Sequence, residues 1–246
     1  TERYSLDFAD EKLKKIGQLA RELNMRLTFH PGQYDVLGTP DQRVLDNTIL
    51  DLECHANILD RMECDQNSVM VIHGGGLYND KNATIERWIK NYNNAPECIR
   101  RRLVLENCEK IFNIEDCLYI SDRCGVPVVF DTHHYDCYNL LHPDINLKEA
   151  KDYIKPILES WKRRNIKPKF HVSEQGSGRV GHHSDLIETI PEYLMEIPEK
   201  YDTNVDTMIE AKHKEKAIAK LHEKYPECNC KKKILKIKLP KVQTVS

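Results

Sequence analysis

The feature that most constrains this chain is a regular alternation of short apolar runs with amphipathic stretches. Runs such as "LVLE" and "VVFD" carry apolar residues at neighbouring positions, so both faces of each strand would be buried. Between them, residues 10–24 repeat apolar side chains every three or four positions, as an amphipathic helix does. This order predicts an α/β fold with a parallel sheet. A length of 246 residues suits one such barrel or a large sandwich.

The expected elements follow from these patterns. We predict six strands, within residues 26–30, 68–76, 101–107, 126–134, 167–174 and 206–212. We predict helices over 10–24 with Asp10 as N-cap, over 44–62 and 95–101, over 114–124 closed by Gly125, over 148–165 interrupted at Pro156, and over 184–195. A loop rich in lysine and asparagine is expected between residues 77 and 94.

Every predicted strand ends in a residue that could bind a metal. A single histidine or carboxylate at such a position is usually a cap or a core residue. Their joint occurrence changes that interpretation, because these residue types are rarely buried unless they are paired or bind a metal. The carboxyl ends of parallel strands lie at one rim, where the active sites of α/β barrels are found. The residues are His30, His73, Glu106, Asp131 followed by His133 and His134, Lys169 with His171, and Glu210.

Histidines mixed with carboxylates suit borderline or hard divalent ions such as Mn²⁺ or hydrolytic Zn²⁺, with Mg²⁺ as a further option. The number of candidate ligands exceeds what one ion with an open position needs. We therefore expect a cluster of two or three ions, which is a common arrangement for phosphodiester hydrolysis.

Composition limits the cellular compartments that we expect for this chain. The chain has no apolar run long enough to span a membrane and opens on polar residues without a secretory signal. Nine cysteines, with only Cys228 and Cys230 close together, favour a reducing intracellular compartment, either cytoplasm or nucleus. Residues 212–246 carry a net charge of +8 and the preceding residues −10. The basic end could contact nucleic acid or simply be solvated.

Six motifs together resemble the UV damage endonucleases. They are "HPGQY", "VIHGGG", "LVLEN", "FDTHH", "KFHVSE" and "MIEAKHKE", and their order and spacing fit from about residue 5 to residue 216. The resemblance implies a TIM-type (β/α) barrel with a manganese cluster. It also implies a metal-dependent endodeoxyribonuclease that nicks double-stranded DNA on the 5′ side of UV photoproducts and some other lesions. Such an enzyme is expected to act as a monomer when full length.

Carried over by position, the resemblance assigns the metal ligands and the catalytic residues. Catalytic roles fall to Glu106, Lys169 and His134, with Glu106 bridging two ions. Lys169 would be either carboxylated beside the ions or a phosphate contact. His183 is preferred over His182 because it lies two residues before Asp185, as in the family's H-x-D pattern. The implied ligands are His30, His73, Glu106, Asp131, His134, His171, His183 and Glu210.

The same resemblance assigns lesion and DNA contacts to Gln33, Tyr34, His133 and Lys212. A phenol can stack in place of displaced bases, and an amide can bond to unpaired base edges. Extruding a photoproduct requires less energy than extruding normal bases. From the residues alone, Tyr34 could instead pack on the rim and Gln33 could cap a turn. His133 could support the ligands from behind or face DNA.

The chain departs from the family's pattern at its beginning. A TIM barrel has eight strands and six are predicted, so we expect the first two β/α units to be missing. The expected organisation is an N-terminally incomplete catalytic barrel over residues 1–216 and a flexible lysine-rich tail over 217–246. Alternative functions are an apurinic endonuclease or sugar isomerase on the same metal barrel, or an inactive DNA-binding fragment.

Overall fold

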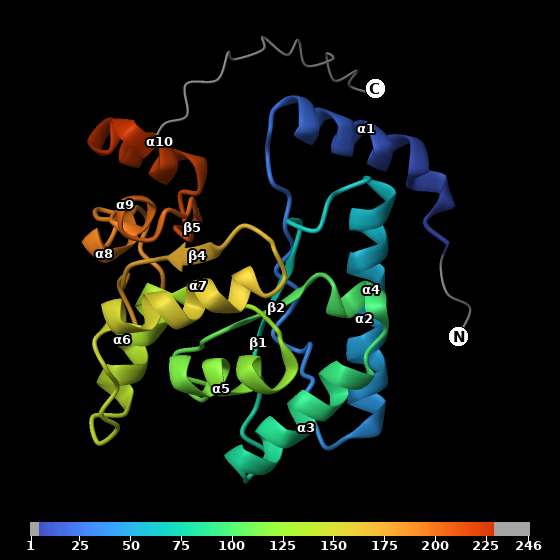
Figure 1. The fold of residues 1–246 in the computed structure, drawn as a ribbon, viewed down its shortest axis with the longest axis horizontal. Coiled ribbons are helices and arrows are strands. Elements are labelled where there is room, and N and C mark those ends of the chain that lie inside the picture. The colour runs from blue at the N-terminus through green and yellow to red at the C-terminus, as the bar shows by residue number, and fades with distance from the viewer. Residues whose placement is uncertain (1–4, 229–246) are drawn as a thin grey trace.

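The protein folds around a five-stranded parallel sheet in the order β1-β2-β3-β4-β5 (Figure 1). The computed structural model describes residues 5–228. The strands are β1 (Met70–His73), β2 (Leu103–Glu106), β3 (Val128–Asp131), β4 (Lys169–Val172) and β5 (Asp206–Ile209). Chain order equals spatial order, so each connection returns to the same end of the sheet, as in a TIM barrel. The predicted parallel α/β architecture is confirmed, and within residues 5–228 the barrel is not closed.

The first predicted strand, residues 26–30, forms only one parallel bridge to the sheet. Phe29 N donates to Val69 O at 3.0 Å and Val71 N donates to Phe29 O at 2.9 Å. Pro31 has no N–H to donate, which limits any longer ladder. The prediction of a regular strand there was wrong, although the segment does lie beside β1.

The sheet curls so that its two ends approach each other. Arg26, at the start of the first segment, donates to Asp206 Oδ2 at the start of β5, at 3.0 Å, and to Lys167 O at 3.0 Å. Lys167 N in turn donates to Asn67 Oδ1 at 2.8 Å, ahead of β1. Side chains, rather than a backbone ladder, therefore draw the amino ends of the strands together.

Helices cover the outer side of this sheet, and several match the sequence-based bounds. Asp41 caps one of them by accepting from Arg43 N and Val44 N. Gly125 ends another in a left-handed conformation (φ 79°), as predicted. The α-helices are α1 (Asp10–Glu22), α2 (Gln42–Arg61), α3 (Lys81–Asn94), α4 (Glu97–Arg100), α5 (Ile114–Cys124), α6 (Thr132–Leu141), α7 (Ile154–Lys162), α8 (Glu192–Met195), α9 (Ile197–Tyr201) and α10 (Glu215–Lys224). Short 3-10 turns cover Asp7–Ala9, Ala150–Tyr153 and Pro226–Cys228.

Four helices of the described residues were missed in the sequence: α3, α6, α9 and α10. The loop expected over residues 77–94 is mostly α3, which begins after Asp80, whose carboxylate accepts from Ala83 N. Polar residues interrupt the apolar pattern of its buried face, which includes Trp88 and Tyr92. The predicted strand over 126–134 ends at Asp131, where α6 begins at once.

Other predictions of local structure were wrong. Asp10 is the first residue of α1 rather than its cap, and its carboxylate pairs with Arg61. Pro156 sits in the first turn of α7, where a missing N–H breaks no helical hydrogen bond. The helix predicted over 184–195 is reduced to α8, since residues 184–191 are held as loop by contacts with Glu174.

The boundary predicted at residue 216 falls inside α10, which buries Ala217 and Leu221. The lysine-rich sequence from residue 229 onward lies outside the described residues. No helix among the described residues is long and apolar enough to cross a membrane.

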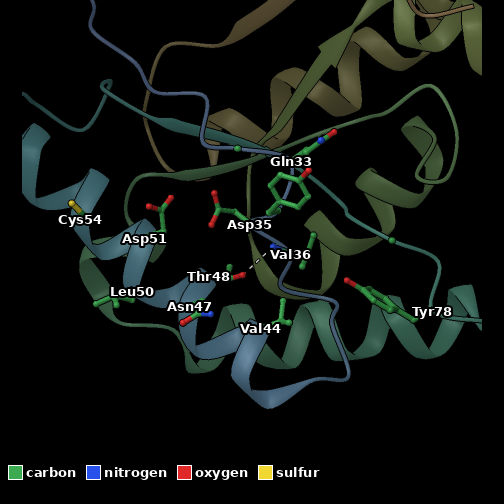
Figure 2. A pocket seen from close by; sticks show the side chains of 13 residues that line it. Gln33, Asp35, Val36, Val44, Asn47, Thr48, Leu50, Asp51, Cys54 and Tyr78 are labelled. Carbon is green, nitrogen blue, oxygen red and sulfur yellow. Dashed lines mark hydrogen bonds between the residues drawn. The ribbon is translucent and has the colours of Figure 1, made fainter. Parts of the chain in front are cut away.

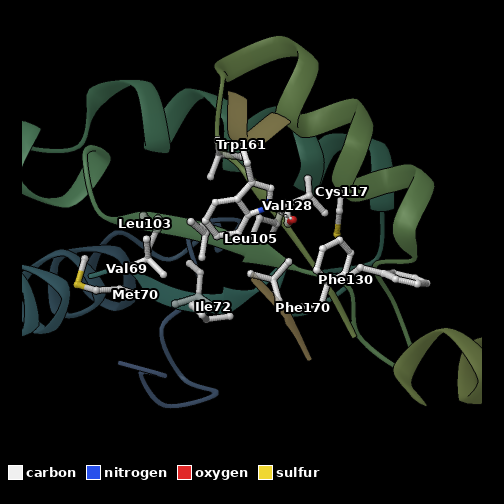
Figure 3. Packing of buried hydrophobic residues seen from close by; sticks show 14 of the residues in the cluster. Val69, Met70, Ile72, Leu103, Leu105, Cys117, Val128, Phe130, Trp161 and Phe170 are labelled. Carbon is white, nitrogen blue, oxygen red and sulfur yellow. Dashed lines mark hydrogen bonds between the residues drawn. The ribbon is translucent and has the colours of Figure 1, made fainter. Parts of the chain in front are cut away.

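The core lies between the sheet and its covering helices (Figure 3). Leu103, Leu105 and Val128 are fully buried, as the all-apolar runs predicted. Trp161 of α7 packs over these strands, and its indole Nε1 donates to Val128 O at 2.6 Å. The helix is thereby fixed on β3 by both apolar contact and a buried hydrogen bond.

A buried arginine fixes the amino end of β2. The guanidinium of Arg102 is 4% exposed and contacts Asp60 Oδ1 at 2.6 and 3.1 Å. It also donates to three backbone carbonyls of the loop between α2 and β1, those of Cys64, Asp65 and Ser68, at 2.8–2.9 Å. These contacts hold the α2–β1 loop against the start of β2.

Replacing Arg102 should therefore destabilise the whole domain. Arg102→Met would leave three carbonyls and the Asp60 carboxylate without this donor, and we expect a loss of about 3 kcal/mol in the free energy of unfolding. Denaturant titration followed by circular dichroism measures this loss. Arg43→Met, at an exposed site in the first turn of α2, serves as the control, and equal midpoints for the two variants would contradict the assigned role.

Candidate metal centre

Glu106, the last residue of β2, stands at the centre of the predicted metal ligands. Its side chain is completely buried. His30 Nε2 lies 2.9 Å from its Oε2, and His171 Nδ1 lies 2.8 Å from its Oε1. His73 Nε2 approaches Oε2 at 3.2 Å, and His134 Nδ1 approaches Oε1 at 3.7 Å. One carboxylate thus gathers imidazoles from four separate segments of the chain.

The ligand atoms form two groups that share Glu106. His30, Glu106, His171 and Glu210 make one, and His73, Glu106 and His134 make the other. Within each group, the potential ligand atoms lie within 4.8 Å of one another. A carboxylate that belongs to both groups can bridge two ions, which is the role that the sequence resemblance gave to Glu106.

Asp131 and His134 are held in place by Asn107. The Asn107 side chain accepts from Asp131 N at 2.9 Å and donates to Asp131 O at 3.0 Å. His134 Nδ1 lies 3.0 Å from Asn107 O, so its Nδ1 proton points to this carbonyl and its Nε2 keeps a free lone pair. Asp131 Oδ1 accepts from His134 N at 2.8 Å and so caps α6. Sequence reasoning did not identify the role of Asn107, although it directly follows Glu106.

Two further residues complete the cluster of predicted ligands. His183 lies in the loop after β4, and Glu210 directly follows β5. Glu210 Oε1 lies 2.9 Å from His171 Nδ1, and its Oε2 lies 3.9 Å from His183 Nε2. The His183 ring lies 6.3 Å from that of His134. His182 instead accepts from Arg179 Nε at 3.2 Å. Of the two neighbouring histidines, the structure brings His183 to the cluster.

The electrostatics of the cluster favour positive charge. Burial opposes ionisation of Glu106, but the imidazoles of His171, His30 and His73 outweigh it and hold the pKa of this carboxyl well below its usual range. Burial likewise disfavours the charged form of His171, but Glu106 and Glu210 raise its pKa to about 10. The same carboxylates raise the pKa of His30 against the effect of burial. Glu106 and Glu210 thus favour positive charge on the surrounding imidazoles. Bound cations would neutralise the same carboxylates.

The residues present fit bound metal ions. Three of the buried polar atoms that have no hydrogen-bond partner among the described residues belong to this cluster: Asp131 Oδ2, His73 Nε2 and His171 Nε2. Buried polar atoms normally find a partner, and imidazole nitrogens and carboxylate oxygens are strong metal ligands. A cluster of divalent ions would satisfy all three atoms.

Lys169, the first residue of β4, is buried below the cluster. Its Nζ donates to Thr28 Oγ1 at 2.8 Å. Burial and the charge of Arg26 lower the pKa of Lys169 to about 8, against the opposing influence of Glu106 and Glu210. Its amine is therefore more readily neutral than that of a surface lysine.

The predicted lesion and DNA contacts differ in exposure. Gln33 is exposed, and Tyr34 is 82% exposed, so Tyr34 does not pack on the rim. Lys212 is exposed and lies 3.9 Å from Asp185. His133 is buried and contacts Cys137 Sγ at 3.4 Å, and its ring lies 6.2 Å from that of His183.

A second carboxylate near the cluster was also missed. Glu109 follows β2 on the same loop as Asn107 and pairs with Lys110 at 3.1 Å. Burial raises its pKa, but its own backbone amide, Lys110 and His134 outweigh that effect and lower it. No pattern in the sequence distinguishes this position from an ordinary loop glutamate.

A cavity of about 920 Å³ lies behind the loop that carries Gln33 and Tyr34 (Figure 2). Its walls come from this loop, from α2 and from the loop after β1. Asp35 and Asp51 face each other in it, and Asp51 Oδ2 lies 3.2 Å from His55 Nδ1. Burial and the charge of Asp51 raise the pKa of Asp35 to about 6. The loop therefore meets α2 at two facing carboxylates, and burial favours the protonated form of Asp35.

Asp35→Asn should make stability less dependent on pH. Because the folded-state pKa of Asp35 is raised above its ordinary 3.8, its protonated form contributes stability that is complete below about pH 4 and is lost as the pH rises through 6. Asparagine donates to Asp51 at any pH, so the variant should be more stable than the parent by about 1 kcal/mol at pH 8 and similar to it near pH 4. Thermal melts at both pH values, with Asp46→Asn as a surface control, measure this. A variant less stable at pH 8 would contradict the raised pKa of Asp35.

The sequence and the fold both match known proteins. Residues 1–241 match the profile of the family described as UV-endonuclease UvdE. A protein of Acanthamoeba polyphaga mimivirus is 38% identical over 225 residues, covering 90% of this chain and 67% of that protein. The UV-damage endonuclease of Schizosaccharomyces pombe is 35% identical over 236 residues, covering 90% of this chain and 37% of that protein.

Among solved structures, the crystal structure of SacUVDE matches with a TM-score of 0.73 at 31% identity, over 89% of this chain and 73% of that chain. Endonuclease IV from Thermus thermophilus, at 14% identity and a TM-score of 0.60 over 92% of this chain and 84% of that chain, shares the fold. The chain spans 67% and 37% of the two relatives' lengths. With nearly its whole length matched by one profile, the chain belongs to the UV-endonuclease UvdE family.

Proposed function

We propose that this chain forms most of the catalytic domain of a metal-dependent DNA repair endonuclease, which nicks double-stranded DNA on the 5′ side of UV photoproducts. The observation that carries the proposal is the buried Glu106 carboxylate, which gathers His30, His73, His134 and His171 at the carboxyl ends of the strands. Membership of the UvdE family supplies the substrate class.

The metal cluster, most simply Mn²⁺, would be held by the two groups that share Glu106, together with Asp131 and His183. When bound, two or three such ions supply charge stabilisation for a phosphodiester and lower the pKa of water. The protein's own part is to hold the ligands rigidly: Asn107 orients Asp131 and His134 through three hydrogen bonds.

Gln33 and Tyr34 would recognise the damage. Both are exposed on a loop that starts directly after His30, so whatever they contact lies beside the metal ligands. A photoproduct weakens stacking and pairing, and an exposed phenol can occupy the place of extruded bases. Selectivity for distorted DNA over a particular sequence follows from this mode of contact.

The alternative functions receive less support. The likenesses to endonuclease IV, at 14% identity, and to a D-psicose 3-epimerase, at 16%, concern the fold alone. An inactive fragment would be expected to have lost ligands, whereas His30, His73, Glu106, His134, His171 and Glu210 lie together in two groups that could hold metal ions.

Glu106→Gln should abolish metal-dependent nicking of UV-irradiated supercoiled plasmid. The amide cannot accept from several imidazoles or neutralise two ions, so we expect a rate loss of at least about 100-fold relative to the parent. Gel conversion of supercoiled to relaxed plasmid, with Mn²⁺ or with chelator, measures this.

Glu97→Gln, an exposed carboxylate on α4, is the matched control and should nick like the parent. Equal nicking of untreated and irradiated plasmid by the parent would contradict the damage specificity. Full activity of the Glu106 variant would refute the role of the cluster.

Mass spectrometry can distinguish the two roles considered for Lys169, because only a carboxylated lysine adds mass to the protein. A buried lysine with a pKa of about 8 has enough neutral amine to add to CO₂, forming an N–C bond and releasing a proton. We expect native mass spectrometry at mildly basic pH, with bicarbonate, to show the added mass of one CO₂, and Lys169→Met to lack it. An unmodified parent would favour the phosphate contact instead.

A further inference from the structure

The loop after β4, residues 175–183, is tightly organised by its own hydrogen bonds. The Gln175 amide donates to Gly176 O and Arg179 O at 2.8 and 3.0 Å and accepts from Gly181 N at 2.9 Å. The backbone closes the loop, since Gly176 N donates to His182 O at 2.6 Å. A polar glycine-rich sequence is thus held in one shape beside the cluster.

Arg179, in the middle of this loop, differs from most arginines of the described part of the chain. Its Nε donates to His182 Nε2 at 3.2 Å, but its two terminal amino groups have no carboxylate or carbonyl partner among residues 5–228. Arginines that pair with carboxylates are Arg21, Arg26, Arg61, Arg101, Arg102, Arg123 and Arg163. Residues 1–211 carry a net charge of −10, and Arg179, like the exposed Arg43, has no carboxylate partner among the described residues.

The position of Arg179 is fixed by its neighbours. His182 Nε2 accepts from Arg179 Nε, and this contact orients the guanidinium. Gly178 has φ +122°, and a Cβ there would lie 2.5 Å from His182 Nδ1. Only glycine allows the imidazole to lie against this backbone.

The loop leads directly into the metal centre. Arg179 precedes His183 by four positions, so their Cα atoms are at most about 14 Å apart even if the chain is fully extended. This distance corresponds to roughly four base-pair steps of about 3.4 Å. Lys212 N donates to Ser184 O at 3.0 Å, which ties the segment after His183 to the exposed Lys212. The free end of Arg179 therefore lies within reach of DNA whose backbone is bound at the cluster.

We infer that Arg179 binds a phosphate of the DNA backbone near the cleavage position and so positions the strand over the metal centre, with His182 orienting its guanidinium. This inference rests on the proposed function. With Nε occupied by His182, the two terminal amino groups can bond to two phosphate oxygens, a geometry that lysine cannot reproduce.

The test measures binding of the whole chain to a fluorescent irradiated duplex by anisotropy, in chelator so that no cleavage occurs, at several KCl concentrations. Arg179→Gln should weaken binding about tenfold and reduce the salt slope by about one unit, as expected for one lost phosphate contact. Arg179→Lys should restore the slope but only part of the affinity. Lys162→Gln, which removes one exposed charge at the other end of the strands, should match the parent, and melting temperatures check folding.

Unchanged affinity and slope in Arg179→Gln, or an equal loss in Lys162→Gln, would overturn the inference and leave the proposed function standing. Parent binding that is the same for irradiated and untreated duplex would overturn the proposed damage specificity but not the Arg179 contact. A parent that binds no duplex would overturn both.

Discussion

The structure depends most on the burial of one carboxylate among imidazoles. Glu106 sits at the end of β2 with no exposed surface, and both of its oxygens contact histidines from other strand ends. An isolated buried carboxylate would be strongly unfavourable, so the surrounding cationic or metal-bound groups must be present for the fold to tolerate it. The stability of the fold and the chemistry of the site therefore depend on the same residues around Glu106.

The supporting interactions lie at both ends of the strands. At the amino ends, Arg102 and Arg26 draw loops and strands together by bonds to carbonyls and carboxylates. At the carboxyl ends, Asn107 and the Asp131 cap fix where β3 becomes α6. The rigid scaffold leaves two exposed elements beside the ligands, the loop of Gln33 and Tyr34 and the loop of Arg179.

The parallel fold and the ligands at the strand ends were predictable because strand burial and ligand chemistry leave a direct mark on residue type. The helix over 81–94 was missed because its buried face, with Trp88 and Tyr92, is interrupted by polar residues. The helix predicted over 184–195 failed because Glu174, distant from the end of that segment, binds its backbone at Glu188 and Thr189. Local periodicity cannot register such a contact.

The sequence by itself determined the order of strands, their burial and the residue types at their ends, since each is set by neighbouring residues. Only the tertiary structure decided that Asn107 orients Asp131 and His134, that Glu210 contacts both His171 and His183, and that Arg179 keeps its terminal amino groups free of partners within residues 5–228. These facts depend on distances between segments far apart in the chain. Such distances are fixed by the curl of the sheet and by loop hydrogen bonds, which no local pattern encodes.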